Sequence, residues 1–224
     1  MLELDLVVFD MVGTTVRATN EVSGALTEAF ARVGVTISDE EIQAVRGKSK
    51  REAISDILMC HLGAADDRDL ASGVYDDFQH IVSERYEEHG IGAIDGAGET
   101  FKWLKAQGVK IALSTGFDRA IADTMVRMMS WNPSIDTVVC NEDVPQGRPA
   151  PYLIFRAMER TGCECVHRVA TVGDTVSDLQ AGFNAGVRWN IGVLSGAHSE
   201  TRLASCSHSQ IITSVKELPS VFEP

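Results

Sequence analysis

The sequence predicts an α/β fold in which a doubly wound, parallel sheet has a helical module inserted between its first and second strands. An apolar run at residues 4–9 ends on Asp10 and is followed by Gly13, which is typical of a buried parallel strand and its turn. Residues 20–89 have helical apolar spacing and no strand-like run, which predicts the inserted module. From Ala93 onward, strand and helix patterns alternate, and this alternation indicates a parallel sheet with helices on both faces.

Each element is predicted from a short segment with one dominant pattern. In the inserted module, apolar residues at helical spacing and acidic outer faces predict four helices. After the module, apolar runs predict strands and amphipathic segments predict helices, the first of them with Asp118 as its N-cap. The helices of the module are predicted at 20–34, 39–45, 50–63 and 69–90; the later strands at 109–114, 136–140, 168–173, 187–193 and 209–214; and the later helices at 118–129, 151–162, 176–186 and 215–222.

Composition limits the classes of partner. The chain has 224 residues, of which 44% are hydrophobic and 23% charged, as in an ordinary globular protein with a sizeable core. A net charge of -12 argues against nucleic acid or an anionic membrane as partner, because both require a basic surface. The five cysteines show no disulfide framework, the first residues lack the basic and then apolar pattern of a leader, and no apolar run approaches membrane length. We therefore expect a cytoplasmic protein that acts on a small molecule.

Four polar side chains follow the ends of predicted strands. Asp10 ends the first strand and Ser114 the second, whereas Arg148 and Asp174 follow the third and fourth. Because ligands bind beyond the carboxyl ends of the strands in such sheets, we expect these four residues to lie together at one edge.

These residues belong to four motifs, which are FDMVGTT, LSTG, GRPAP and VGDTVSD in chain order. With these motifs the chain resembles the haloacid dehalogenase superfamily over nearly its whole length, and within it the phosphonatase group (phosphonoacetaldehyde hydrolase and its phosphonatase-like relatives). The resemblance implies a hydrolase with a Rossmann-like core at residues 1–17 and 92–224. It also implies a helical cap at residues 18–91 that acts as a lid, and a homodimer formed through the cap.

The resemblance implies a role for each motif residue. Asp10 would be the nucleophile that forms an aspartyl-phosphate. Asp174 would bind Mg²⁺ together with the carboxylate of Asp10 and the main-chain carbonyl of Val12, because Mg²⁺ prefers such oxygen ligands. Asp178 would be a further ligand or support one; alternatively, it satisfies free N–H groups at the start of its helix.

The phosphoryl group would be held by the second and third motifs. Ser114, or the amides of Thr115 and Gly116, would donate hydrogen bonds to a phosphoryl oxygen; alternatively, Ser114 only stabilises the next turn. Arg148 stands where most of the superfamily has lysine, and its planar fork can bind phosphate through two hydrogen bonds. The alternative for Arg148 is a salt bridge on the surface.

Val12 occupies the position where phosphomonoesterases of this superfamily have a second aspartate. That aspartate protonates the leaving alkoxide, and such acid–base catalysis contributes about 10²–10⁴-fold. Valine has no proton to donate, so the chain is either a poor esterase or acts on a substrate whose leaving group needs no acid. The phosphonatase group, with alanine at this position, illustrates the second case: a cap lysine forms a Schiff base with the substrate, and the iminium accepts the electrons of the breaking C–P bond.

Lys50 matches this cap lysine. With Gly47 it forms the Gly-x-x-Lys element of the phosphonatase cap, in the segment VRGKSKREAI. A Schiff-base amine must be neutral, and the neighbouring Arg46, Lys48 and Arg51 would favour that form. Two alternatives remain open: Lys50 binds a substrate anion, or it is structural.

Two cap positions depart from the phosphonatase pattern. Arg46 stands where that group has methionine, and Ala53 where it has histidine. The first change suggests a substrate with an additional anionic group, which Arg46 would contact.

The leading hypothesis is therefore a Mg²⁺-dependent hydrolase that cleaves the C–P bond of phosphonoacetaldehyde or a related 2-oxo-alkylphosphonate. The alternatives are a phosphatase, similar to phosphoglycolate phosphatases, or a mutase-like phosphotransferase acting on a small phosphate ester. A non-catalytic, ligand-binding relative is a third possibility and a dehalogenase a fourth, although a dehalogenase would leave the acidic DTVSD element without a purpose.

Overall fold

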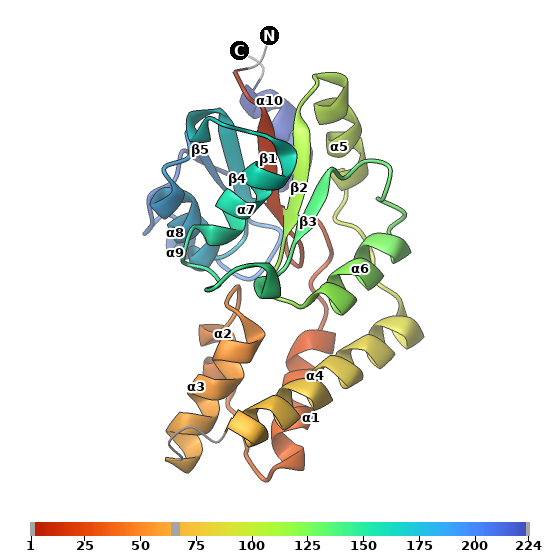
Figure 1. The fold of residues 1–224 in the computed structure, drawn as a ribbon, viewed down its shortest axis with the longest axis vertical. Helices are drawn as coiled ribbons and strands as arrows, with labels where there is room; N and C mark the ends of the chain where they lie inside the picture. Colours follow the sequence, from red (N-terminus) through yellow and green to blue (C-terminus); the bar gives the residue numbers. More distant parts are fainter. Residues whose placement is uncertain (1–2, 64–67, 223–224) are drawn as a thin grey trace. The chain divides into compact units, whose positions relative to one another are not determined.

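The computed structural model describes residues 3–63 and 68–222. These residues form two compact units, which meet in the chain between Ala18 and Thr19 and again between Gly90 and Ile91. We call the unit that contains the sheet the core unit and the helical unit, Thr19–Gly90, the cap unit. Each boundary lies one residue from the position predicted from the sequence. In Figure 1, the cap unit is coloured from orange to yellow.

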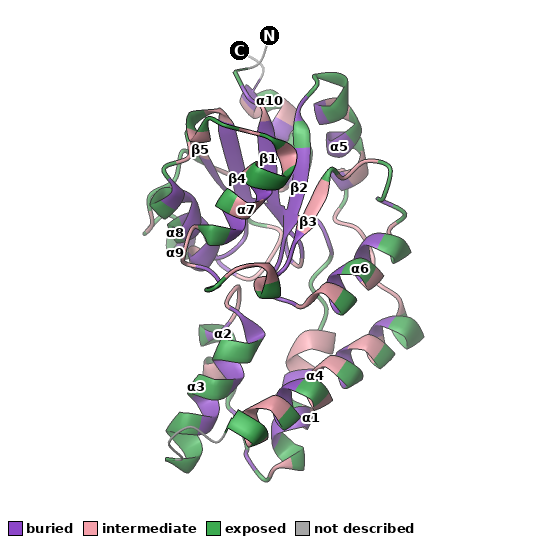
Figure 2. Cartoon of the chain, viewed as in Figure 1, coloured by how far each residue is buried: buried purple, intermediate pink, exposed green. Residues whose placement is uncertain are grey.

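The core unit contains a parallel, six-stranded sheet with the order β3-β2-β1-β4-β5-β6 within the described residues. Its central strand β1 is buried along its whole length, because helices cover both faces of the sheet (Figures 1 and 2). The doubly wound fold predicted from the sequence is therefore confirmed. The strands are β1 (Leu6–Asp10), β2 (Lys110–Ser114), β3 (Thr137–Val139), β4 (Val169–Gly173), β5 (Trp189–Val193) and β6 (Gln210–Ile212).

Helices of the core unit alternate with these strands. Asp118 occupies the N-cap position of its helix as predicted, but its side chain forms no capping hydrogen bond there. Two helices, α5 and α9, were not predicted as separate elements. The helices are α5 (Ala97–Ala106), α6 (Arg119–Met128), α7 (Tyr152–Thr161), α8 (Val176–Ala185), α9 (Glu200–Leu203) and α10 (Leu218–Phe222), with short 3-10 turns η1 (Asn141–Asp143), η2 (Val166–Arg168) and η3 (Val215–Glu217).

The hydrophobic core under the site packs two helices against the centre of the sheet. Leu6 and Val8 of β1 contact a cluster that includes Leu153 and Ala157 of α7 and Ala181 of α8. All five side chains are at most 2% exposed. This packing fixes the helices that flank the carboxyl ends of β1 and β4.

The two chain segments that lead to the cap unit are joined to each other within the core unit. The amide of Arg17 donates a 2.8 Å hydrogen bond to the carbonyl of Gly92, and the amide of Ile94 donates one of 2.8 Å to Thr15. The side chain of Arg17 adds a 2.9 Å bond from Nε to the carbonyl of Ala93. The departing and returning segments therefore form a small, hydrogen-bonded base.

The cap unit consists of four helices in its described part. Arg32 of α1 forms a 2.7 Å ion pair with Asp77 of α4, and Arg85 of α4 forms one of 2.8 Å with Glu28 of α1. Buried side chains such as Phe30 lie between these helices. The helices are α1 (Glu21–Arg32), α2 (Asp39–Ala44), α3 (Lys50–Leu62) and α4 (Arg68–His89). Among the described helices of the chain, none has the length and apolar character that crossing a membrane requires.

Candidate active site

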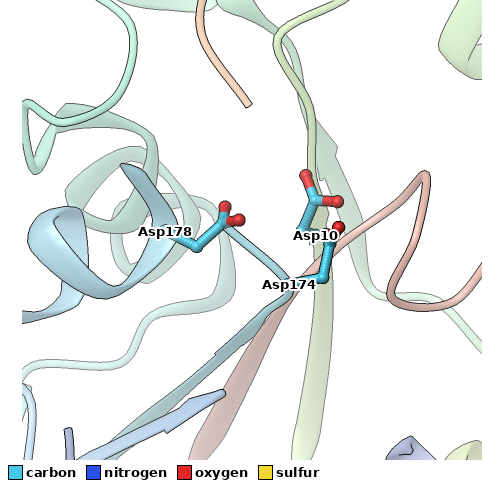
Figure 3. Close-up of side chains that lie close together, drawn as sticks. All are labelled: Asp10, Asp174 and Asp178. Carbon is cyan, nitrogen blue, oxygen red and sulfur yellow. The ribbon is translucent and has the colours of Figure 1, made fainter. Parts of the chain in front are cut away.

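Three carboxylates meet at the carboxyl end of the sheet. Asp10 is the last residue of β1, Asp174 follows β4, and Asp178 lies in the first turn of α8. One oxygen from each carboxylate lies within 4.8 Å of the others, and Figure 3 shows the three groups directed toward a common space. This grouping follows from the parallel pairing of β1 with β4, which brings their carboxyl ends side by side.

Arg148 enters this cluster from the loop after β3. Its Nη1 donates a 2.6 Å hydrogen bond to Oδ1 of Asp10 and a further bond to Oδ1 of Asp178. The side chain is 4% exposed, and its Nε has no hydrogen-bond partner within the described residues. Burial excludes the surface salt bridge left open by the sequence. The unused Nε is a donor available to a ligand oxygen.

Asp174 is held from two sides. Thr14 Oγ1 donates to its Oδ1 at 3.1 Å, and the amide of Ala197 donates to its Oδ2 at 2.7 Å. A Cβ atom at Gly13 or at Gly196 would collide with the carboxylate. Burial, reinforced by the nearby charge of Asp10, raises the pKa of Asp174 to about 7. The carboxyl group is therefore costly to ionise without a compensating cation.

The cluster fits a divalent cation. The cluster contains three buried carboxyl groups and one guanidinium, which bonds to two of them, so acidic groups are in excess. Carboxylate oxygens are the ligands that Mg²⁺ prefers in proteins. The donor set and the raised pKa of Asp174 both agree with a metal held by Asp10, Asp174 and Asp178.

We expect the stabilisation of the protein by Mg²⁺ to increase with pH. In the metal-free protein, the raised pKa of Asp174 makes stability fall as pH rises from about 4 toward 7, because the folded state disfavours the ionised carboxylate. Protons compete with the metal below pH 7, so the affinity for Mg²⁺ should be about tenfold weaker at pH 6 than at pH 8. Thermal unfolding with and without Mg²⁺ at the two pH values measures this. Asp174→Asn should abolish the difference, whereas equal shifts of the wild-type Tm at both pH values would contradict the assignment.

Asp178 uses its two oxygens for different purposes. Oδ2 accepts hydrogen bonds from the amide and hydroxyl of Thr175, at 3.0 and 2.5 Å, in a capping box at the start of α8. Oδ1 accepts from Arg148 within the cluster. Both roles considered for Asp178 from the sequence, helix capping and participation in the site, are therefore compatible with its position.

Two polar groups of the second motif already donate hydrogen bonds to neighbouring strands. Ser114 Oγ donates to the carbonyl of Phe9 at 3.3 Å, and the amide of Thr115 donates to Val139 at 3.0 Å. The Thr115 amide, expected from the sequence to bind a phosphoryl oxygen, is thus engaged with the neighbouring strand β3. Gly116, which is half-buried in the next turn, remains the candidate donor of this pair.

Lys50 is the first residue of α3 in the cap unit, and its side chain is buried. Its Nζ donates to the carbonyls of Val45 and Lys48 at 3.4 and 3.3 Å, across a turn in which Gly47 has a φ of +75°. These two bonds fold the lysine back over the turn.

The neighbours of Lys50 differ in their environment. Arg51 of α3 places its guanidinium over the ring of Tyr75 of α4, 4.1 Å from the centroid, so its charge forms a cation–π contact between these two helices. Arg46 is half-buried in the turn before Lys50, and Ala53 is buried. The three cap histidines lie beside glutamates: His61 with Glu41, His80 with Glu84 and His89 with Glu21.

The sequence did not identify the loop after β5 as part of the site. Ser195 Oγ donates to the carbonyl of Gly13 at 2.7 Å, and Ala197 holds Asp174 as described above. The loop follows the carboxyl end of a parallel strand, as do the other site segments. Its position after a parallel strand could have identified this loop from the sequence as part of the site.

A parallel sheet with three aspartates and an arginine at its carboxyl end, and with a helical unit inserted between β1 and β2, is typical of one class of hydrolases with a Rossmann-like core. The model of the haloacid dehalogenase-like hydrolase family matches residues 4–186, and the chain belongs to this family. The chain is accordingly a hydrolase, and the resemblance inferred from the four motifs is confirmed.

Curated relatives of the chain include proteins named phosphonoacetaldehyde hydrolase. The chain is 30% identical over 212 residues to phosphonoacetaldehyde hydrolase of Bacillus cereus (strain B4264), covering 88% of this chain and 78% of that protein. It is 30% identical over 210 residues to the bifunctional phosphonoacetaldehyde hydrolase/aminoethylphosphonate transaminase of Clostridioides difficile (strain 630), but spans 32% of that longer protein. A crystal structure of a phosphonoacetaldehyde hydrolase-like protein from Oleispira antarctica has a TM-score of 0.84 and 22% identity, covering 98% of this chain and 91% of that one; this similarity concerns the fold.

Proposed function

We propose that the chain is a Mg²⁺-dependent hydrolase that cleaves the C–P bond of phosphonoacetaldehyde or of a related 2-oxo-alkylphosphonate. The observation that carries the proposal is the side chain at position 12. Val12 is half-buried and lies two residues after Asp10, the end of strand β1. Its side chain cannot protonate a leaving group, so we expect a substrate whose leaving group needs no acid at this position. The identity of 30% to proteins named phosphonoacetaldehyde hydrolase supports the same substrate class.

Asp10, Asp174 and Asp178 would hold Mg²⁺, together with the main-chain carbonyl of Val12. When bound, the ion supplies positive charge that neutralises the phosphoryl oxygens, without which an anionic nucleophile could not approach phosphorus.

Asp10 would then attack phosphorus through a carboxylate oxygen and form an aspartyl-phosphate. Arg148 is positioned to help, because it already contacts Oδ1 of Asp10 at 2.6 Å and has an unused Nε donor within the described residues. A guanidinium that binds both the nucleophile and a phosphoryl oxygen would align the two groups. Gly116 would donate a further hydrogen bond from its amide.

Lys50 would provide the electron sink. Its amine adds to the carbonyl carbon of the substrate and water leaves, which gives an iminium. When the C–P bond breaks, the phosphoryl group passes to Asp10 and the bonding electrons pass into the iminium, which becomes an enamine. Protonation and hydrolysis of the enamine release the aldehyde or ketone and restore the amine, and a second water hydrolyses the aspartyl-phosphate to restore Asp10. Arg46 would contact an anionic group on the substrates that carry one.

A second candidate function is hydrolysis or transfer of the phosphoryl group of a small phosphate ester. The contacts of Lys50 favour it: Nζ donates to the carbonyls of Val45 and Lys48, and carbonyl oxygens stabilise the protonated form of an amine. In that case Lys50 would bind the substrate by charge and would form no covalent bond.

Borohydride trapping separates the two functions. With phosphonoacetaldehyde or a 2-oxo-alkylphosphonate present, borohydride should reduce the Schiff base and add the mass of the substrate carbon skeleton to the peptide that contains Lys50. The exposed surface lysine Lys110 serves as the control for non-specific modification. Turnover of a phosphonate without any adduct at Lys50 would contradict the Schiff base, and turnover of phosphate esters alone would establish the second candidate.

The missing acid can be supplied by mutation. Val12→Asp should raise the rate of hydrolysis of an alkyl phosphate by about 10²-fold, because a carboxylic acid at this position could protonate the alkoxide. Hydrolysis of p-nitrophenyl phosphate should change little, because p-nitrophenolate is a good leaving group without protonation. Steady-state rates for the two esters provide the comparison, and an equal gain for both would show that position 12 does not act as an acid.

A further inference from the structure

His198 lies in the loop after β5 and is 6% exposed. Its Nδ1 accepts a 2.9 Å hydrogen bond from the amide of Val176, the first residue of α8. The first amides of a helix have no partner within the helix, so a side chain from elsewhere can bind them. His198 therefore anchors the start of the helix that carries Asp178.

The same loop holds Asp174 through main-chain groups. The amide of His198 donates to the carbonyl of Asp174 at 3.3 Å, and the amide of Ala197 donates to its Oδ2 at 2.7 Å. Gly196 brings the loop so close that a Cβ atom there would collide with the Asp174 carboxylate. His198 and the residues before it thus contact the segment 174–176 at three points: a carbonyl, a carboxylate and a helix amide.

We propose that His198 is a positioning residue for the two aspartates of the fourth motif. Its imidazole fixes the segment between Asp174 and α8, and so sets the separation of Asp174 from Asp178. Both aspartates are proposed to hold Mg²⁺, so this inference rests on the metal requirement of the proposed function. Groups that orient metal ligands in this way commonly change metal affinity 10- to 100-fold when they are removed.

Replacement by asparagine or glutamine tests which atom of His198 matters. Asparagine places its Oδ1 near the position of Nδ1 and can accept the Val176 bond, whereas the longer glutamine places its oxygen near Nε2. We expect His198→Asn to keep the Kd for Mg²⁺ within about threefold of wild type, and His198→Gln and His198→Ala to weaken it about 10- to 100-fold. Isothermal titration calorimetry with MgCl₂ on the full chain measures Kd without substrate.

Two controls separate positioning from stability. Ser38→Ala removes a helix capping box in the cap unit and should lower Tm while leaving the Kd for Mg²⁺ unchanged. Tm values measured in EDTA show whether each His198 variant is folded, and the comparison of asparagine with glutamine still decides the matter if the alanine variant does not fold.

The outcomes are distinct. Equal Kd values for the asparagine and glutamine variants, or a lower Tm with an unchanged Kd in all variants, would overturn the role of His198 alone. A wild-type protein that binds no Mg²⁺ would overturn the metal requirement of the proposed function and this inference with it.

Discussion

Asp10→Asn should abolish turnover of every phosphonate and phosphate ester that the wild-type enzyme accepts. The amide is a poor nucleophile toward phosphorus, and removal of a nucleophile in other enzymes lowers kcat by about 10⁴-fold or more. The substitution also removes the charge that interacts with Arg148 and that helps to raise the pKa of Asp174. Phosphate release measured over a panel of substrates, with intact-mass detection of the aspartyl-phosphate, gives the result.

The control for this prediction is Asp123→Asn, which removes the same charge from an exposed position on α6. It should leave kcat and KM unchanged. A normal rate in Asp10→Asn would refute the assignment of the nucleophile, and the same loss in both variants would indicate a non-specific effect of charge.

Lys50→Arg and Lys50→Ala should both eliminate C–P cleavage, to below about 10⁻⁴ of the wild-type rate. Arginine keeps the positive charge but cannot form a Schiff base, so it separates covalent catalysis from binding of an anion. If Lys50 only binds the substrate anion, Lys50→Arg should retain much of the rate, with the loss mainly in KM. Rates with phosphonoacetaldehyde and with a phosphate ester distinguish the two cases.

Lys48→Ala is the matched control, because Lys48 lies two residues earlier in the same turn and its carbonyl accepts a hydrogen bond from Lys50. Its removal should change the rate of C–P cleavage far less than that of Lys50. The Kd for Mg²⁺ should be the same in all three variants, since the proposed ligands lie in the core unit. Loss of metal affinity in a Lys50 variant would contradict the separation of roles.

The fold was predictable because its main elements carry strong local patterns. Strand β1 is apolar from Leu6 to Phe9 and buried along its whole length, and buried parallel strands are among the few elements with this pattern. Helix α5 was missed because it begins after Gly96, at a φ of +83°, with no side chain to cap it, so it lacks the usual N-terminal signal. The four-residue helix α9 is too short to show a helical period.

The site was only partly predictable, for a different reason. Asp10, Arg148 and Asp174 could be identified because a parallel sheet brings the carboxyl ends of its strands together. The contribution of Ala197 could not, because a main-chain amide donates the bond to Asp174 and any residue type except proline provides that group. The environment of Lys50 could not be predicted from the sequence either. Its neighbour Arg51 lies over Tyr75, which is distant in the sequence, and local spacing does not predict such a contact.

The pairing of Arg17 with Gly92, and of Thr15 with Ile94, has an evolutionary consequence. The segment that leaves the core unit and the segment that returns to it are hydrogen-bonded to each other at this point. For the sheet, the cap unit between them is therefore equivalent to a long hairpin loop. Insertions are tolerated where the two flanking segments are already hydrogen-bonded to each other, because the sheet keeps its strand order and its hydrogen bonds. An ancestral gene could therefore have exchanged one inserted module for another while the parallel sheet and its carboxylate cluster stayed unchanged.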